Sequence, residues 1–140
     1  CPFAAHIRKT NPRADLGDPG VTAPFRILRH GIPYGKEVTF RESKLGLNRT
    51  ELDRGLLSVC YQSNLKNGFQ FMQKSWANKT DFVTDGTGHD PLIGVDPRPD
   101  NAARPQNAVR TVTGVNPLNA NSPLSLPKNW VISRGGEYFF

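Results

Sequence analysis

The sequence predicts an α+β fold, and three observations carry that prediction. Segments 25–31 and 54–62 have the alternating or continuous apolar pattern of β-strands. Segment 63–76 has an apolar side chain at every third or fourth position, which is typical of a helix. Strands and helices do not alternate in regular βα units, so they should be segregated rather than wound into a parallel sheet.

Length and composition indicate a single domain with much irregular chain. With 140 residues, the whole of 1–140 is expected to form one domain around a modest core. The 12 Pro and 13 Gly predict long loops, above all a Pro- and Asn-rich irregular stretch at 95–127. Cys1 at one end and the apolar Phe139 and Phe140 at the other predict a piece that is truncated at both ends.

The first third of the chain should hold a short helix, a loop and a strand. Residues 1–9 are expected to be helical, because Pro2 suits a first helical turn and Phe3 and Ile7 are four residues apart. Asn-Pro and Asp-Pro-Gly steps predict a loop over 10–24. The strand at 25–31 follows, and 36–53 is predicted to be a polar connection.

Alternation in the strand at 25–31 raises a question about one cation. Phe25, Ile27 and Arg29 share a face if the strand has a period of two. A buried Phe-Ile face would place Arg29 in the interior, where a cation requires a partner or a function. The alternatives are that the opposite face is buried, or that Arg29 lies beyond the edge of the core.

The strand at 54–62 is apolar on both faces, which predicts a central, covered strand. Leu56, Ser58 and Cys60 share one of these faces. Cys1 and Cys60 lie in apolar contexts and are expected to be buried thiols rather than a disulfide framework or a zinc site.

The second half should contain one helix and a final strand. Ser63 is a suitable N-cap for the helix at 63–76, whose apolar stripe is Leu65, Phe69, Met72 and Trp76. A loop is expected over 77–94. The apolar segment 130–140 predicts a strand with a kink or bulge at its Gly-Gly pair.

The net charge of +6 and a pI of about 9.7 describe a basic chain. Scattered Lys and Arg on a solvated surface explain this excess, and an anionic partner such as the carboxylates of a buried cofactor is the alternative. The sequence has no basic run or RNA-binding signature, and no apolar run of about 18 residues, so neither nucleic acid nor a membrane is expected as a partner. The glycosylation acceptors Asn48-Arg-Thr and Asn78-Lys-Thr favour secretion.

Six blocks of sequence occur in a specific order. They are C-P-F-A-A-H-I-R-K-T-N-P-R, R-H-G-I-P-Y-G, R-G-L-L-S-V-C-Y-Q, N-G-F-Q-F-M-Q-K-S-W, G-H-D-P-L-I-G and I-S-R-G-G-E-Y-F-F. Together they resemble the dye-decolorizing peroxidases of the fungal secreted kind, over almost the whole chain except 95–127. The resemblance implies the C-terminal half of a haem peroxidase with two ferredoxin-like halves, each an antiparallel sheet with helices on one face.

The resemblance also implies the chemistry. The cofactor would be haem b, the substrates hydrogen peroxide with dyes or phenolic compounds, the location extracellular, and the partner a missing N-terminal half of the same protein. His6 matches the axial iron ligand, and the small side chains of Ala4 and Ala5 would let a porphyrin approach. His30 and His89 are the other histidines, and neither lies in the matching segment.

Other residues match the surroundings of the haem. Asp90 matches the acceptor for the second imidazole nitrogen, which would make the ligand electron-rich; alternatively it caps a turn before Pro91. Arg13 and Arg8 are candidates to pair with haem propionates, with simple solvent exposure as the alternative.

On the peroxide side, Arg29 matches the family's distal arginine, whose guanidinium can polarise the O–O bond. Leu56 and Ser58 match positions that line the peroxide channel, where Ser58 departs from a common Phe. Tyr34 and Trp76 match places that can hold surface radicals, although most such aromatics are packing anchors.

One expected motif is missing. The family's G-x-x-D-G supplies a distal aspartate, but the only Asp-Gly step here is Asp85-Gly86, with Phe82 in place of the first glycine. The proton-transfer group is therefore expected outside this chain. Two further interpretations stay open: a haem-binding or structural fragment without turnover, and a basic module that binds an anionic polymer.

Overall fold

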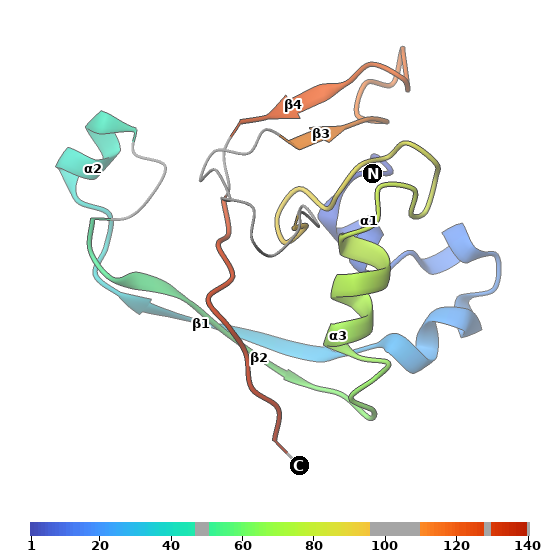
Figure 1. The fold of residues 1–140 in the computed structure, drawn as a ribbon, viewed down its shortest axis with the longest axis horizontal. Helices are drawn as coiled ribbons and strands as arrows, with labels where there is room; N and C mark the ends of the chain where they lie inside the picture. Colours follow the sequence, from blue (N-terminus) through green and yellow to red (C-terminus); the bar gives the residue numbers. More distant parts are fainter. Residues whose placement is uncertain (47–50, 96–109, 128–129, 140) are drawn as a thin grey trace, which may run out of the picture.

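The computed structural model describes residues 1–46, 51–95, 110–127 and 130–139. These residues form short helices and two antiparallel sheets of two strands each, β1-β2 and β3-β4. Figure 1 shows a body made of α1, α3 and the β3-β4 pair, from which the β1-β2 hairpin leads away to α2. The predicted α+β class is confirmed, and the described residues contribute two small sheets rather than one continuous sheet.

Helix α1 spans His6–Thr10 and is shorter than the predicted 1–9. Pro2 lies in a turn before the helix, where its carbonyl accepts the amide of Ala5 at 3.0 Å. The helix ends at Thr10 with Asn11 as its C-cap, directly before Pro12, which has no amide hydrogen to continue the ladder. Because of the turn at Pro2, the helix begins on His6 itself.

The prediction of a plain loop over 10–24 is wrong. Two 3-10 helices, η1 (Arg13–Leu16) and η2 (Pro19–Phe25), occupy most of it. The Asp18 carboxylate accepts the amide of Gly20 at 2.7 Å and caps η2, which starts with Pro19. An Asp-Pro-Gly sequence can begin a helical turn as well as break one.

Strand β1 spans Leu28–Gly35, so it begins three residues later than predicted and runs past Pro33. It pairs along its whole length with β2 (Arg54–Tyr61), which matches the predicted second strand. Since Phe25 and Ile27 lie outside the strand, their burial says nothing about the face of Arg29. All eight residues of β1 are exposed, so of the alternatives considered for Arg29, a position outside the core holds in the described chain.

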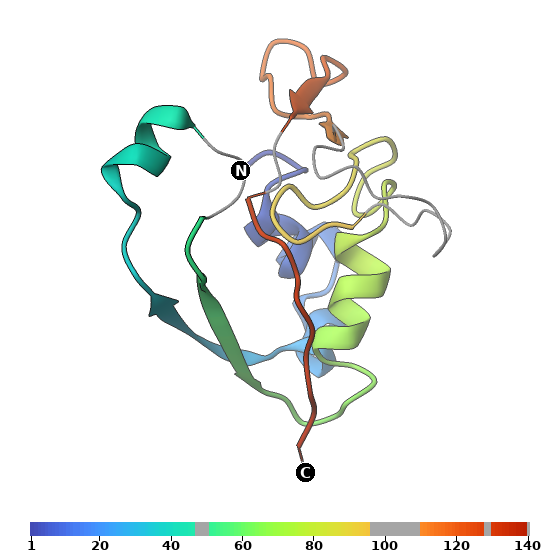
Figure 2. The same cartoon turned by 60° about the vertical axis from the view of Figure 1, so that its left-hand side comes forward.

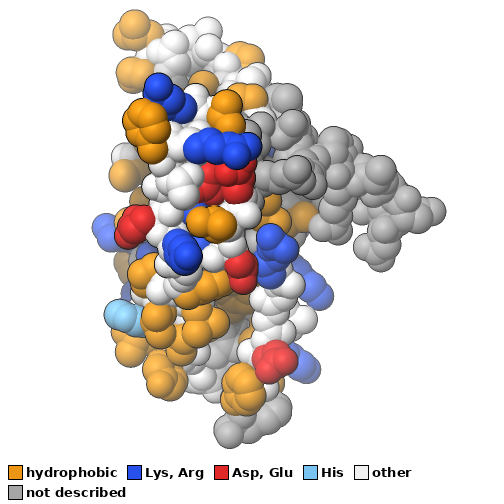
Figure 3. All heavy atoms as spheres, turned by 90° about the vertical axis from the view of Figure 1, so that its left-hand side faces the viewer, with side chains coloured by type: hydrophobic (Ala, Val, Ile, Leu, Met, Phe, Trp, Pro, Cys, Tyr) orange, Lys and Arg blue, Asp and Glu red, His pale blue; other side chains and the backbone are white. Residues whose placement is uncertain are grey.

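The prediction that the second strand is central and covered is also wrong here. β2 has one neighbour in its sheet, and most of its residues are exposed. Figure 3 views the molecule from the left-hand side of Figure 1 and shows hydrophobic side chains gathered over the lower part of that side. Exposed apolar residues of the hairpin include Leu28, Ile32, Leu56, Leu57 and Tyr61. None of the helices in the described part of the chain has the length and hydropathy of a bilayer-spanning segment.

Helix α2 (Phe40–Leu45) lies within 36–53, which was predicted to be only a polar connection. Thr39 and Glu42 form a reciprocal capping box, and Gly46 ends the helix with φ of 55°. The T-F-R-E tetrapeptide at 39–42 is the signature that could have predicted this helix. Figure 2 shows α2 at the far end of the hairpin, away from α1 and α3.

The helix predicted at 63–76 begins only at Phe69. Helix α3 (Phe69–Phe71) continues directly into a π-helical segment, η3 (Met72–Ala77). The Gln62 side chain accepts the Phe69 amide at 2.8 Å, and a Cβ at Gly68 would lie 2.0 Å from its Oε1. The helix begins after Gly68, so Ser63 is not the N-cap and Leu65 lies outside the helix.

Aromatic rings form the packing beneath α3 and η3. Trp76 is 4% exposed, stacks on Phe82 at 5.3 Å and meets Phe25 and Phe71 edge-on. Phe25 and Phe71 stack at 4.2 Å. These contacts join η2 to the helix and its following loop, which come more than 40 residues later in the sequence. They bury the side of the helix that carries its apolar residues.

The stretch predicted to be irregular at 95–127 contains β3 (Arg110–Val112) and β4 (Leu124–Leu126). Val112 and Leu126 form a small buried cluster with Ala4. By contrast, residues 130–139 belong to no strand, because no described strand pairs with them. The prediction of a final strand over 130–140 is therefore wrong for these residues.

Residues 96–109 and Asn48 lie outside the described residues. Cys1 is exposed and Cys60 is half-buried, so the prediction of two buried thiols is wrong.

A buried ion pair joins α2 to the hairpin. The Arg54 guanidinium donates to both carboxylate oxygens of Glu42, at 3.0 and 2.9 Å, and to the carbonyls of Lys36 and Glu37. Hydrogen bonds from Arg54, and then from the Thr39 amide, hold the pKa of the Glu42 carboxyl well below its ordinary 4.5. A carboxyl with a lowered folded-state pKa stabilises the fold above its unfolded-state pKa.

We therefore expect Glu42→Gln to lower the free energy of unfolding at neutral pH, with a difference from the wild type that shrinks as the pH falls below 4.5. Urea unfolding across this pH range measures the difference. Glu51→Gln is the control, because its carboxylate meets Arg41 only at 3.5 Å in a largely exposed pair. A Glu42→Gln difference that is the same at every pH would contradict the assignment.

Candidate functional site

The loop after η3 folds back on itself and ends at Asp90. The amide of Gly88 donates to the carbonyl of Thr80 at 2.8 Å, and the amide of Asp90 donates to that of Ala77 at 2.8 Å. Gly88 has φ of 91°, and a Cβ there would lie 2.3 Å from the carbonyl oxygen of Thr111. Glycine is thus required where the loop passes β3, and this passage fixes the position of Asp90.

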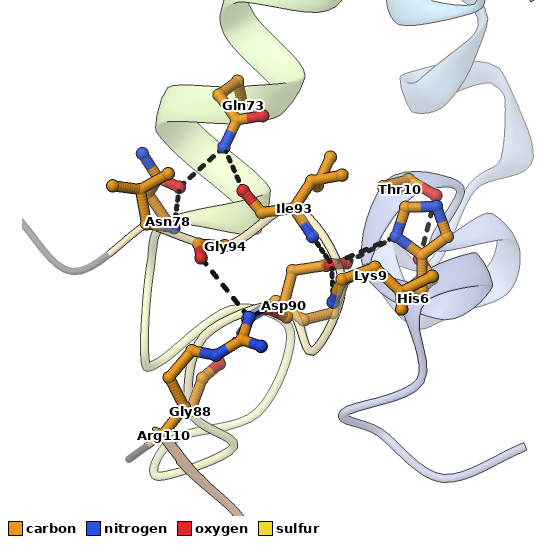
Figure 4. A network of polar contacts seen from close by, with 12 residues as sticks. His6, Lys9, Thr10, Gln73, Asn78, Gly88, Asp90, Ile93, Gly94 and Arg110 are labelled. Carbon is orange, nitrogen blue, oxygen red and sulfur yellow. Dashed lines mark hydrogen bonds and ion pairs between the residues drawn. The ribbon is translucent and has the colours of Figure 1, made fainter. Parts of the chain in front are cut away.

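His6 and Asp90 meet although 84 residues separate them. The imidazole Nδ1 lies 2.9 Å from Oδ2 and 3.1 Å from Oδ1 of the carboxylate (Figure 4). Asp90 also accepts the amides of Leu92 and Ile93, at 2.9 and 2.8 Å. The carboxylate therefore caps the turn that contains Pro91 and also holds the imidazole of His6.

The protonation state of Asp90 follows from its surroundings. Its side chain is 0% exposed, and burial alone would raise its pKa. The hydrogen bonds from His6 and from the Ile93 and Leu92 amides, with the charge of His6, lower the pKa, and they prevail. An ionised Asp90 can only accept, so Nδ1 carries the proton of this hydrogen bond, and whenever the imidazole is neutral Nε2 keeps its lone pair.

Nε2 of His6 makes no hydrogen bond within the described residues, and the side chain is 28% exposed. A neutral imidazole with one nitrogen fixed by a carboxylate and the other open is the donor set that proteins use to bind a metal centre. Of the two small residues before it, Ala4 is buried against Val112 and Leu126, and Ala5 is half-buried. These residues fit an axial ligand of a haem iron.

Two buried cations flank Asp90. Lys9 is fully buried, and its Nζ donates to the carbonyls of Lys79 and Gly88, each at 2.6 Å. Burial lowers the pKa of Lys9 to about 8, although the charges of Asp90 and Asp81 oppose this shift. Arg110 donates to the carbonyl of Asp90 at 3.2 Å, and burial lowers its pKa against the opposing charge of Asp90.

Sequence reasoning did not single out Lys9 or Arg110. Lys9 stands in a run of polar residues that reads as solvated surface, and Arg110 stands in a stretch with no recognisable pattern. One signal was available for Lys9, because it lies three residues after His6 and therefore on the same side of α1.

The two arginines proposed to pair with propionates differ in their surroundings. Arg8 is engaged: it donates to both oxygens of Asp15, at 2.8 and 2.5 Å, and to the carbonyl of Cys1. It also lies over the ring of Phe3, and the hydrogen bond with Asp15 raises its pKa despite partial burial. Arg13 is exposed, has φ of 51° and forms no ion pair with any described residue.

The register of the hairpin places Arg29, Leu56 and Ser58 on one face. Arg29 is opposite Cys60, and the next two pairs on this face join Gly31 to Ser58 and Pro33 to Leu56. A Cβ at Gly31 would lie 3.2 Å from the Leu56 side chain, so the glycine leaves room for this leucine. Leu56 is 64% exposed, and Arg29 and Ser58 are also exposed.

The remaining candidates are spread over the molecule. Tyr34 lies on the other face of β1 and is 48% exposed. Trp76 is buried among aromatic rings, so the expectation of a place near the exterior is wrong for it. His30 is exposed on β1, and His89 is half-buried beside Asp90.

Comparison with known proteins identifies the family. A family model described as "Dyp-type peroxidase, C-terminal" matches residues 1–89, which is more than half of the chain. The chain belongs to the Dyp-type peroxidases. This match contains His6, the whole β1-β2 hairpin and the helix α3, and it ends one residue before Asp90.

Relatives and solved structures extend the similarity over the rest. The dye-decolorizing peroxidase msp1 of Mycetinis scorodonius is 50% identical over 142 residues, and the dye-decolorizing peroxidase AauDyP1 of Auricularia auricula-judae is 46% identical over 152 residues. Each comparison covers 100% of this chain, but only 28% and 27% of the relative. A crystal structure of the Auricularia auricula-judae peroxidase matches with a TM-score of 0.80 and 41% identity, over 97% of this chain and 30% of that one.

The chain thus spans a little over a quarter of the length of the curated relatives it matches. Dyp-type peroxidases are haem enzymes, and the similarity over the whole of this chain places it with them rather than with the basic anion-binding module considered from the sequence. It also supports the predicted α+β architecture, which this chain shares with the structure of the Auricularia auricula-judae enzyme.

Asp90→Ala should destabilise the protein by about 1–3 kcal/mol, because it leaves the buried amides of Leu92 and Ile93 without an acceptor and removes the partner of His6. Urea unfolding measures this loss. The control is Asp85→Ala, whose exposed side chain should change the free energy of unfolding by less than about 0.5 kcal/mol. Equal effects of the two substitutions would show that Asp90 does not anchor the loop.

Proposed function

We propose that this chain is the haem-ligating part of a dye-decolorizing peroxidase, which uses hydrogen peroxide to oxidise dyes and phenolic compounds. The observation that carries the proposal is the His6–Asp90 pair, an imidazole anchored at Nδ1 by a buried carboxylate and open at Nε2. In a chain of the Dyp-type family, that arrangement supports an axial haem ligand.

His6 is proposed to bind the iron of haem b through Nε2. Bound haem supplies an iron that peroxide oxidises by two electrons and that substrates reduce again, one electron at a time. Asp90 holds the Nδ1 proton and fixes the plane of the ring, because both carboxylate oxygens lie within 3.1 Å of it. A carboxylate partner increases the electron density of the imidazole, which favours peroxide cleavage over reversible oxygen binding.

Arg29 is proposed to act on peroxide. A guanidinium is permanently charged, so it can polarise the O–O bond and stabilise the negative charge that develops on the leaving oxygen. Leu56 and Ser58, on the same face of the hairpin, would line the approach of peroxide. Ser58 gives this lining a small hydroxylated side chain, which leaves room for a water molecule.

The remaining roles are pairing with the haem propionates and passing electrons from bulky substrates. Arg13, exposed and outside any ion pair with a described residue, is the better candidate to meet a haem propionate, because Asp15 and the Cys1 carbonyl already occupy Arg8. Tyr34, nearly half exposed, is proposed to pass electrons from bulky substrates. Trp76 is proposed to pack, since its indole is enclosed by Phe25, Phe71 and Phe82.

The wider protein is proposed to be secreted, with the group that moves the peroxide proton in the part that this chain does not include. The two glycosylation acceptors at Asn48 and Asn78 support secretion. Asn78 is half-buried at the end of η3, where its Oδ1 accepts the amide of Val95 at 2.9 Å.

In the full-length protein, His6→Ala should abolish the Soret band that haem reconstitution produces in the wild type, because the axial ligand is lost. Absorption spectroscopy after gel filtration measures it. His30→Ala is the matched control and should keep the band, since His30 is an exposed residue of β1. An unchanged Soret band with intact axial ligation in His6→Ala would rule His6 out.

Arg29→Leu should retain haem and its Soret band but slow the reaction with hydrogen peroxide by about 100- to 1000-fold, the loss expected when one charge-stabilising donor is removed. Stopped-flow absorption measures this rate. Arg26→Leu removes a neighbouring exposed cation as the control and should leave the rate near that of the wild type. If both variants react at the wild-type rate, Arg29 has no role in peroxide cleavage.

A further inference from the structure

Lys9 bridges the neck of the loop that leads to Asp90. Its Nζ donates to the carbonyls of Lys79 and Gly88, which lie on the two sides of this neck. The amide of Gly88 closes the neck with a hydrogen bond to the carbonyl of Thr80. The ammonium therefore ties both ends of residues 79–88 to α1, the helix that begins with His6.

The hydrogen bonds of Lys9 hold the loop close to Asp90. Asp90 follows Gly88 by two residues, and its own amide is held by the carbonyl of Ala77. In Figure 4, Lys9 and His6 extend from the same helix toward the Asp90 segment, and Arg110 approaches that segment from β3. The distance between the imidazole and its carboxylate partner thus depends on how Lys9 seats the loop against α1.

The charge of Lys9 requires its own explanation. The side chain is 0% exposed, and a buried ammonium that meets carbonyl groups rather than a carboxylate is costly. Met could occupy similar space without that cost. The attraction between the charges of Lys9 and Asp90 opposes the effect of burial on the pKa of Lys9.

We propose that Lys9 is a positioning residue for His6: it holds the Asp90 loop against α1, and its positive charge limits how far Asp90 draws the Nδ1 proton from the imidazole. This inference rests on the proposed role of His6 as haem ligand. Without the charge, Asp90 pulls more strongly on the proton, the imidazole donates more electron density, and the ferric state gains relative to the ferrous state.

Three variants of the full-length, haem-loaded protein separate charge from packing. Lys9→Gln removes the charge and keeps two N–H donors on a side chain one atom shorter, and Lys9→Arg keeps the charge. Lys79→Gln removes a charge from the exposed side of the same loop. Spectroelectrochemical titration gives the Fe(III)/Fe(II) midpoint potential, and resonance Raman of the ferrous protein gives the iron–imidazole stretching frequency.

Lys9→Gln should shift the midpoint potential to a more negative value and raise the stretching frequency. Lys9→Arg and Lys79→Gln should stay near the wild type in both. A purely structural role predicts the opposite order, because the larger Arg side chain disturbs the packing more than Gln does. If Lys9→Gln does not fold, Lys9→Arg decides: a wild-type potential supports the proposal, and a lowered one overturns it.

Two failures can be told apart. A Lys9→Gln protein with wild-type potential and frequency overturns the role of Lys9 and leaves the haem assignment standing. A wild-type protein that binds haem without an iron–imidazole band overturns the role of His6, and with it the proposal for Lys9.

Discussion

The geometry of the site depends on a buried carboxylate, that of Asp90. It accepts His6 and two backbone amides of its own turn, so one side chain both shapes the loop and fixes the imidazole. A buried carboxylate is tolerated only when its oxygens are satisfied, and each donor here comes from a different residue. Because His6 begins α1 while Asp90 ends a long loop, this interaction also joins two parts of the chain that are far apart in sequence.

Two buried cations hold the backbone around this carboxylate. Lys9 and Arg110 direct their donors at backbone carbonyls around Asp90 rather than at the carboxylate, so the oxygens of Asp90 remain available to His6 and the amides. Asp90 attracts both cations, and this attraction opposes the effect of burial on their pKa values. A basic composition thus includes two cations that serve the interior, and net charge alone gives no sign of this.

The hairpin contrasts with this compact region. β1 and β2 pair along eight residues each, yet their side chains are mostly exposed, and α2 is held to the end of the hairpin by the Glu42–Arg54 ion pair. Arg29, Leu56 and Ser58 share a face because of the strand register, whatever covers that face. The chain spans a little over a quarter of its curated relatives, and the apolar strands of this hairpin are largely uncovered in the described residues.

The sequence by itself determined the α+β class, the extent of the second strand, the family and the identity of His6 and Asp90 as a candidate pair, because these depend on local period and on ordered motifs. It failed where a distant contact decides the outcome. Helix α3 starts at Phe69, whose amide the Gln62 side chain accepts, and Trp76 is buried because Phe25 and Phe82 arrive from other segments. Lys9 reads as surface in the sequence, and only the folded loop encloses it. Burial and charge environment are properties of neighbours, and the tertiary structure alone supplies those neighbours.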